Sequence, residues 1–135
     1  MGIIEIKNLH LGFYTANGFA EAIHGVSLEI NKGELHALVG ESGCGKTITA
    51  MSILNLLPKN ARITKGKILF HDKNLLDLPP TEMNKIRGAK IALIPQDPMT
   101  SLNPLYTIEN QLLEVIKIHQ GVEGEEAHKR ALEAL

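Results

Sequence analysis

One continuous stretch of this chain, Gly40 to Thr47, has the residue types and spacing needed to hold phosphate groups. It reads Gly-Glu-Ser-Gly-Cys-Gly-Lys-Thr and fits the pattern G-x-x-x-x-G-K-[ST]. Gly40, Gly43 and Gly45 can adopt positive φ and let the backbone approach a ligand closely. We expect the loop N–H groups to point inward as an anion-binding nest, and the following helix to add the positive end of its dipole.

Two side chains of this loop have specific expected roles. Lys46 should reach the β- and γ-phosphates of a nucleotide, and the Thr47 hydroxyl should be a ligand of Mg²⁺. The competing interpretation is a glycine-rich turn with an incidental lysine, which the flanking sequence disfavours. The whole expected nucleotide-binding set of this region is Gly40, Glu41, Ser42, Gly43, Cys44, Gly45, Lys46, Thr47 and Ile48.

The flanking sequence has the order strand, loop, helix. Residues 35–39 are mostly apolar, as expected for a buried parallel strand. Residues 48–57 favour a helix that ends before Pro58. Since this order places the N–H groups of a helix N-terminus on a phosphate, the sequence predicts nucleotide binding.

Alternating patterns predict an antiparallel sheet beside this unit. Apolar and polar residues alternate around Ile4 and Ile6, and again along residues 26–30. A turn is expected at residues 13–18. The later segments predict short strands at 67–70 and 91–94, helices at 81–87 and 106–118, and a last helix that starts after Gly121 or Gly124 and still runs at Leu135.

Composition narrows the class of protein. The chain has 135 residues, of which 44% are hydrophobic and 21% charged, so it can form one domain with a core. Its net charge of −1 gives no reason to expect nucleic acid or an anionic membrane as a steady partner. The single cysteine, Cys44, suits a reducing compartment. No apolar run approaches the length of a membrane span and the N-terminus lacks a signal-peptide pattern, so we expect a soluble intracellular protein.

Gln96 lies just after the predicted strand at residues 91–94. Ligands of open α/β sheets bind beyond the carboxyl ends of the strands. An amide at this place can ligate Mg²⁺ and hydrogen-bond a water near the γ-phosphate. The alternative is a loop glutamine that satisfies local backbone groups, and position alone leaves both interpretations open.

An acidic residue that closes an apolar run, which P-loop triphosphatases use to help hold Mg²⁺, is missing from this sequence. Asp77 follows only two leucines, and Asp97 lies beyond Pro95 and Gln96. The chain therefore carries half of a catalytic site.

The segment from Ile94 to Pro104, Ile-Pro-Gln-Asp-Pro-Met-Thr-Ser-Leu-Asn-Pro, makes the resemblance to a known family specific. Together with the glycine-rich loop, it resembles the ATP-binding subunits of ABC transporters, and among them the oligopeptide/dipeptide importer branch, which also covers some nickel importers. Residues 25–30, 33–34 and 86–88 agree with this resemblance, which covers nearly the whole chain.

The resemblance implies an α/β fold: a P-loop NTPase (RecA-like) core with an N-terminal antiparallel β-subdomain and the start of a helical subdomain, truncated. Residues 1–96 would be the N-terminal part of the nucleotide-binding domain. Residues 97–135 would hold the Q-loop and the beginning of the helical subdomain.

The family also implies site residues. Gln96 would be the Q-loop glutamine, acting in catalysis with Lys46 and binding Mg²⁺ with Thr47. An aromatic residue would stack on adenine; Phe13 aligns best and Tyr14 is the neighbouring alternative, although either could instead pack within the sheet. The helical subdomain touches the membrane-spanning subunits in this family, so residues 97–105 are the candidate coupling surface.

The implied function is that of the energy-coupling subunit of a peptide importer, which binds Mg-ATP and couples its hydrolysis to import. Its partners would be the membrane-spanning permease subunits and a second ATP-binding subunit, on the cytoplasmic face of the cell membrane and without direct insertion. Nucleic acid is not an expected partner.

Several family motifs do not occur in this sequence: the Leu-Ser-Gly-Gly-Gln signature, the Walker B aspartate, its adjoining glutamate and the switch histidine. We therefore expect an N-terminal portion of a longer subunit, which by itself hydrolyses ATP negligibly. The alternative is a truncated, non-catalytic module that binds nucleotide or a partner subunit. A different P-loop enzyme, such as a nucleotide kinase, would need lid arginines and an acceptor pocket, and no such cluster stands out.

Overall fold

We describe the protein from a computed structural model that places residues 2–97 and 101–135. The chain forms two compact units, one ending at Asn84 and the other running from Lys85 to Leu135, and each is described by itself. The predicted domain boundary after residue 96 stays a prediction, because a compact unit is not by itself a domain.

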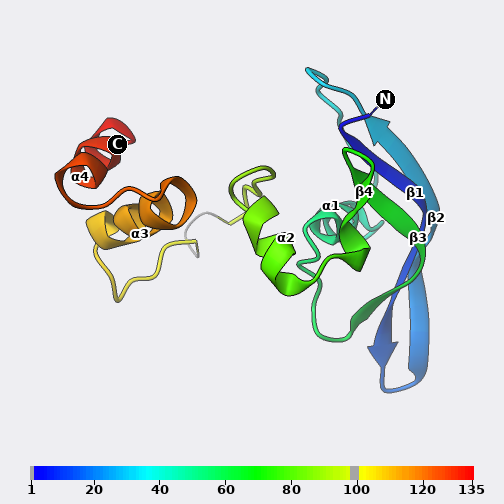
Figure 1. Ribbon diagram of the computed structural model, residues 1–135. Helices are drawn as coiled ribbons and strands as arrows, with labels where there is room; N and C mark the ends of the chain where they lie inside the picture. Colours follow the sequence, from blue (N-terminus) through cyan, green and yellow to red (C-terminus); the bar gives the residue numbers. More distant parts are fainter. Residues whose placement is uncertain (1, 98–100) are drawn as a thin grey trace. The chain divides into compact units, whose positions relative to one another are not determined.

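The first unit is built on a four-stranded antiparallel sheet of order β2-β1-β3-β4. A hairpin of two long strands, β1 (Ile4–Thr15) and β2 (Gly18–Ile30), forms one side and is drawn in blue in Figure 1. The strands β3 (Ala61–Phe70) and β4 (Lys73–Asn74) complete the sheet. The hairpin turns at residues 16–17, so both the predicted antiparallel sheet and the predicted turn are confirmed.

The alternating pattern of β1 places its apolar residues in the core of this unit. Ile6, Leu9 and Leu11 are fully buried, together with Ile68 of β3 and Leu75. Two extra residues in β2 shift its register against β1 between Leu9 and Gly12. These bulges bend the hairpin while β1 keeps its alternation from Leu9 to Phe13.

Short helices follow the sheet strands in the first unit. The helix α1 (Lys46–Ile53) is shorter than the predicted 48–57, because Asn55 adopts a left-handed conformation with φ 51° that ends a helix. A 3₁₀ turn, η1 (Leu75–Asp77), leads to α2 (Pro80–Ile86), which confirms the helix predicted at 81–87 and buries Met83.

Two predicted strands are wrong. Residues 35–39 have no strand structure, and Leu35 and Val39 are 98% and 89% exposed. Residues 91–94 form only an isolated bridge between Arg87 and Ile91. A buried parallel strand exists only when neighbouring strands satisfy its backbone groups. Within the described residues neither segment is part of a sheet, and most of these apolar side chains are exposed to solvent.

The second unit contains a pair of helices, α3 (Ile108–Gln120) and α4 (Gly124–Glu133). Their small core consists of Ile116, Ala127 and Ala131, against which Leu112, Leu113 and Val122 pack. Both predicted helices are confirmed. The last one ends at Glu133 rather than running on at Leu135 as predicted, and the Ala134 N–H donates to the carbonyl oxygens of Arg130 and Ala131 at its end.

Candidate functional site

The backbone of the predicted phosphate loop, residues 40–47, has the conformation that its glycines allow. Gly43 and Gly45 have φ of 81° and 95°, which other residues rarely adopt. Gly45 is also the N-cap residue of α1, and no side chain caps this helix N-terminus. The first N–H groups of α1 therefore have no side-chain acceptor, which is the arrangement that an anion can use.

Lys46 crosses the loop with its side chain. Its Nζ donates to the carbonyl oxygens of Gly40 at 2.8 Å and Glu41 at 2.6 Å, and lies 3.5 Å from the Sγ of Cys44. These bonds hold the Lys46 ammonium against the backbone of the loop. To bind a phosphate directly, Lys46 must exchange these carbonyl contacts for the ligand.

The other predicted loop residues are exposed or half-buried. Glu41, Ser42, Cys44 and Thr47 are exposed, whereas Ile48 is half-buried. The Cys44 N–H, which is predicted to bind phosphate, donates to the carbonyl oxygen of Glu41 at 3.4 Å and closes a turn within the loop. To donate to a phosphate, the Cys44 N–H would have to break its bond to the Glu41 carbonyl.

Two residues that support the loop were missed in the sequence. The side chain of Ile23 in β2 fills the space that a Cβ on Gly45 would occupy, so the sheet and the loop touch at this point. Thr49 is buried in α1, and its hydroxyl donates to the Gly45 carbonyl at 2.8 Å. For Ile23, its apolar character within a strand could have indicated a buried contact. For Thr49, the sequence offered only its spacing of four residues from Gly45.

Phe13 and Tyr14 lie on opposite faces of β1. Tyr14 is 58% exposed and meets the ring of Phe19 edge-on at 5.2 Å between centroids. Phe13 is half-buried and shares its face with Leu11, since side chains two apart in a strand point the same way. Leu11 is paired with Ile23, the residue that touches Gly45. The phosphate loop is therefore on the Phe13 face of the sheet.

Gln96 belongs to the second unit and is exposed there. Its role beside the phosphate loop stays a prediction. The predicted coupling surface, residues 97–105, is described only in part, because residues 98–100 lie outside the described residues. Leu102 and Leu105 of this segment are 52% and 87% exposed.

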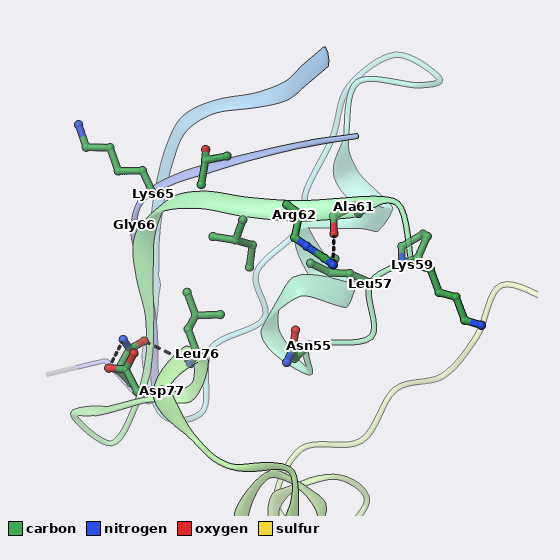
Figure 2. A pocket seen from close by; sticks show the side chains of 13 residues that line it. Asn55, Leu57, Lys59, Ala61, Arg62, Lys65, Gly66, Leu76 and Asp77 are labelled. Atoms are coloured by element: carbon green, nitrogen blue, oxygen red, sulfur yellow. Dashed lines mark hydrogen bonds between the residues drawn. The ribbon is translucent and has the colours of Figure 1, made fainter. Parts of the chain in front are cut away.

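A pocket of about 430 Å³ lies elsewhere in the first unit, between the end of α1 and strand β3. None of the residues that line it belongs to the phosphate loop. Figure 2 shows that Lys59 and Lys65 extend outward from it. Arg62 donates to the carbonyl of Ala61 at 3.0 Å, and Asn74 bonds to Asp77 at 2.8 Å. Because its cations do not converge, this pocket does not form a charged site.

Two features are absent from the described residues. These residues contain no group of three or more His, Cys, Asp or Glu side chains arranged to hold a metal ion. None of the helices described for this chain combines the length and the apolar composition that crossing a bilayer requires.

Known proteins resemble the chain in sequence over nearly its whole length. It is 46% identical over 134 residues to the dipeptide transport ATP-binding protein DppD of Bacillus subtilis, covering 98% of this chain and 40% of that protein. It is 44% identical to the oligopeptide transport ATP-binding protein OppD of the same organism, over 98% of this chain and 37% of that protein. The chain thus spans about two fifths of the length of these curated relatives.

Solved structures resemble it in fold. The post-hydrolysis dimer of the ATP-binding cassette MJ0796, bound to ADP and Pi, matches with a TM-score of 0.80 and 30% identity, over 96% of this chain and 54% of that one. A second dimeric structure of MJ0796 matches with a TM-score of 0.81. The α/β cassette fold expected from the sequence is thereby confirmed, although the chain covers about half of it. The profile of the ABC transporter family matches residues 23–135. The chain therefore belongs to the ABC transporter family.

Proposed function

We propose that this chain is part of the ATP-binding subunit of an ABC importer for peptides, and that it binds Mg-ATP through residues 40–47. The observation that carries the proposal is the phosphate loop. Gly45 in a left-handed conformation opens an uncapped helix, and the Lys46 ammonium lies within the same loop. The peptide class of substrate is supported by the names of the DppD and OppD relatives.

The loop residues fit a nucleotide triphosphate with its metal. Lys46 would neutralise charge on the β- and γ-phosphates, and the N-terminal N–H groups of α1 would donate to phosphate oxygens. Mg²⁺, when bound, neutralises phosphate charge and orients the phosphates. Thr47 is exposed in the first turn of α1, so its hydroxyl is free to turn toward such an ion, with Gln96 as the proposed second ligand.

The adenine would stack on Phe13 rather than on Tyr14. Phe13 is on the sheet face that carries Ile23 and, through it, Gly45. Tyr14 is on the other face, where it already contacts Phe19. A base bound together with phosphates on residues 40–47 needs its stacking partner on the same side as the loop.

The partners follow from the family. The MJ0796 cassette is dimeric in its solved structures, which supports a second ATP-binding subunit as a partner of this one. Residues 97–105 would contact the membrane-spanning permease subunits and hold this subunit on the cytoplasmic face of the cell membrane. Gln96 would link that contact to the state of the nucleotide. We further propose that the 135 residues alone bind ATP without measurable turnover.

A thermal melt of this chain with and without Mg-ATP tests the binding proposal, with Lys46→Ala as the control. Because a ligand stabilises the state that binds it, we expect ATP to raise the midpoint of the wild type and not of the variant. A cooperative transition that ATP leaves unchanged in the wild type would contradict the proposal. An ATPase assay with turnover that depends on Lys46 would contradict the second part.

A further inference from the structure

The side chain of Gln111 bonds to the backbone of the segment that leads into α3. Its Nε2 donates to the carbonyl oxygens of Asn103 at 3.0 Å and Tyr106 at 3.1 Å, with a longer contact to that of Thr107 at 3.5 Å. Its Oε1 accepts from the N–H of Asn103 at 2.9 Å. One amide thus binds four backbone groups of the preceding loop, using both its donor and its acceptor ends.

The hydrogen bonds made by the Gln111 amide are here called the clamp. Residues of the loop make further hydrogen bonds among themselves. The Asn103 Oδ1 accepts from the N–H of Leu105 at 3.0 Å, and the Tyr106 N–H donates to the Asn103 carbonyl at 3.2 Å. Thr107 caps α3 by accepting from the N–H of Asn110 at 3.2 Å. The backbone of residues 103–107 is therefore held in one shape by short-range hydrogen bonds.

The side chains of this loop, in contrast, are apolar and open to solvent. Leu102, Leu105 and Tyr106 are 52%, 87% and 60% exposed. Residues 101–108 contain no charged residue, and the carboxylate that follows them in the sequence, Glu109, is paired with His128 at 2.8 Å. An ordered loop that displays large apolar side chains binds a partner at a low entropic cost. Its lack of charge selects an apolar partner surface.

We propose that Gln111 is a positioning residue that holds residues 101–107, here called the docking loop, in the shape that receives an apolar cytoplasmic segment of the membrane-spanning subunit. This inference rests on the proposed function, and it adds the residue that determines the loop shape and the apolar character of the contact. Gln111 does not itself touch the partner in this account. It acts through the carbonyl groups that it binds.

The variant Gln111→Glu tests the clamp with almost no change of size. It keeps an acceptor for the Asn103 N–H but replaces the Nε2 donor with an oxygen that faces carbonyl oxygens, which repels them. The matched control is Asn110→Asp, the same amide-to-acid change at the neighbouring position. Asn110 is exposed, and its side chain takes no part in the clamp. A second variant, Gln111→Met, removes the clamp without adding charge.

The experiment measures assembly of the complete ATP-binding subunit with its membrane-spanning subunits, alongside ATP binding by the subunit alone. We expect Gln111→Glu and Gln111→Met to weaken assembly about tenfold or more, while ATP affinity, melting temperature and the Asn110→Asp control stay near wild type. Wild-type assembly should change little with added salt, because the contact is uncharged.

The failures of the two proposals are distinguishable. Assembly of both Gln111 variants as tight as that of the wild type would overturn the positioning role and leave the proposed function intact. Equal weakening by Asn110→Asp would overturn it as well, because the clamp would then not be the cause. A folded wild-type subunit that binds ATP yet does not assemble with the membrane-spanning subunits would overturn the proposed function itself.

Discussion

Two loops of this chain run directly into a helix, and their polar groups are used in opposite ways. The phosphate loop enters α1 through Gly45, with no side-chain cap, and the Lys46 ammonium donates to the carbonyl oxygens of Gly40 and Glu41. The docking loop enters α3 through Thr107, which caps the helix, and Gln111 binds its backbone carbonyls.

This difference shows which groups each loop leaves available for binding. Residues 40–47 leave the N–H groups at the helix N-terminus without a side-chain acceptor, so those groups are available to an anion. Residues 101–107 use their backbone groups internally and expose Leu102, Leu105 and Tyr106 instead. The phosphate loop thus leaves hydrogen-bond donors available, whereas the docking loop exposes apolar side chains.

The largest effect in this comparison is expected for Gly45→Ala. The new Cβ would be held at φ 95° and would meet the buried side chain of Ile23. We expect the strain and the overpacking together to cost about 2–4 kcal/mol of unfolding free energy and to abolish ATP binding. Urea unfolding and a nucleotide titration measure the two effects.

Two further variants separate strain from contact. Gly33→Ala has a similar φ of 78° and nothing within 4 Å of its new Cβ, so it should cost only the strain, about 1 kcal/mol. Adding Ile23→Val to Gly45→Ala removes the atom in closest contact and should recover part of the loss. Equal destabilisation by Gly33→Ala and Gly45→Ala would show that the contact with Ile23 does not matter.

A smaller effect is expected at the cap of the second loop. Thr107→Ala removes the acceptor for the Asn110 N–H and should destabilise α3 by about 1 kcal/mol, while Thr107→Ser keeps the hydroxyl and should be near neutral. Amide hydrogen exchange at the start of α3 reports the change. Unaltered exchange in Thr107→Ala would mean that Gln111 alone holds this helix start.

The smallest effect concerns pH at the turn that precedes the phosphate loop. The Asn31 backbone N–H donates to Glu34 at 2.7 Å and, with the Asn31 side chain and His36, holds the pKa of this exposed carboxyl below its ordinary value of 4.5. The stabilisation is therefore complete above pH 4.5 and is lost as pH falls through the lowered pKa. Glu34→Gln should flatten the dependence of stability on pH below 4.5. A pH dependence of Glu34→Gln identical to that of the wild type would contradict this account.

Local patterns predicted much of the fold. Alternation around Ile4 and Ile6 indicated the first strand, and the 3.6-residue period after Tyr106 indicated α3, because both depend on neighbours within a few residues. The phosphate loop was predicted for the same reason: its glycines determine which backbone angles are open to it.

The two strand predictions that proved wrong also share a cause. Residues 35–39 and 91–94 have the composition of buried strands, yet composition cannot supply the neighbouring strands that such segments need. Within the described residues these neighbours are missing, so the apolar character of both segments is present without the structure that it favours.

The sequence by itself determined the hairpin and the helix pair, and it predicts the phosphate-binding role of Lys46 and Thr47, since these follow from residue type and short-range spacing. Only the tertiary structure decided that Ile23 packs on Gly45, that Phe13 rather than Tyr14 shares the face of the phosphate loop, and that Gln111 binds the docking loop. Contacts of this kind depend on strand register and on the path of the chain between distant residues, and no local pattern encodes either.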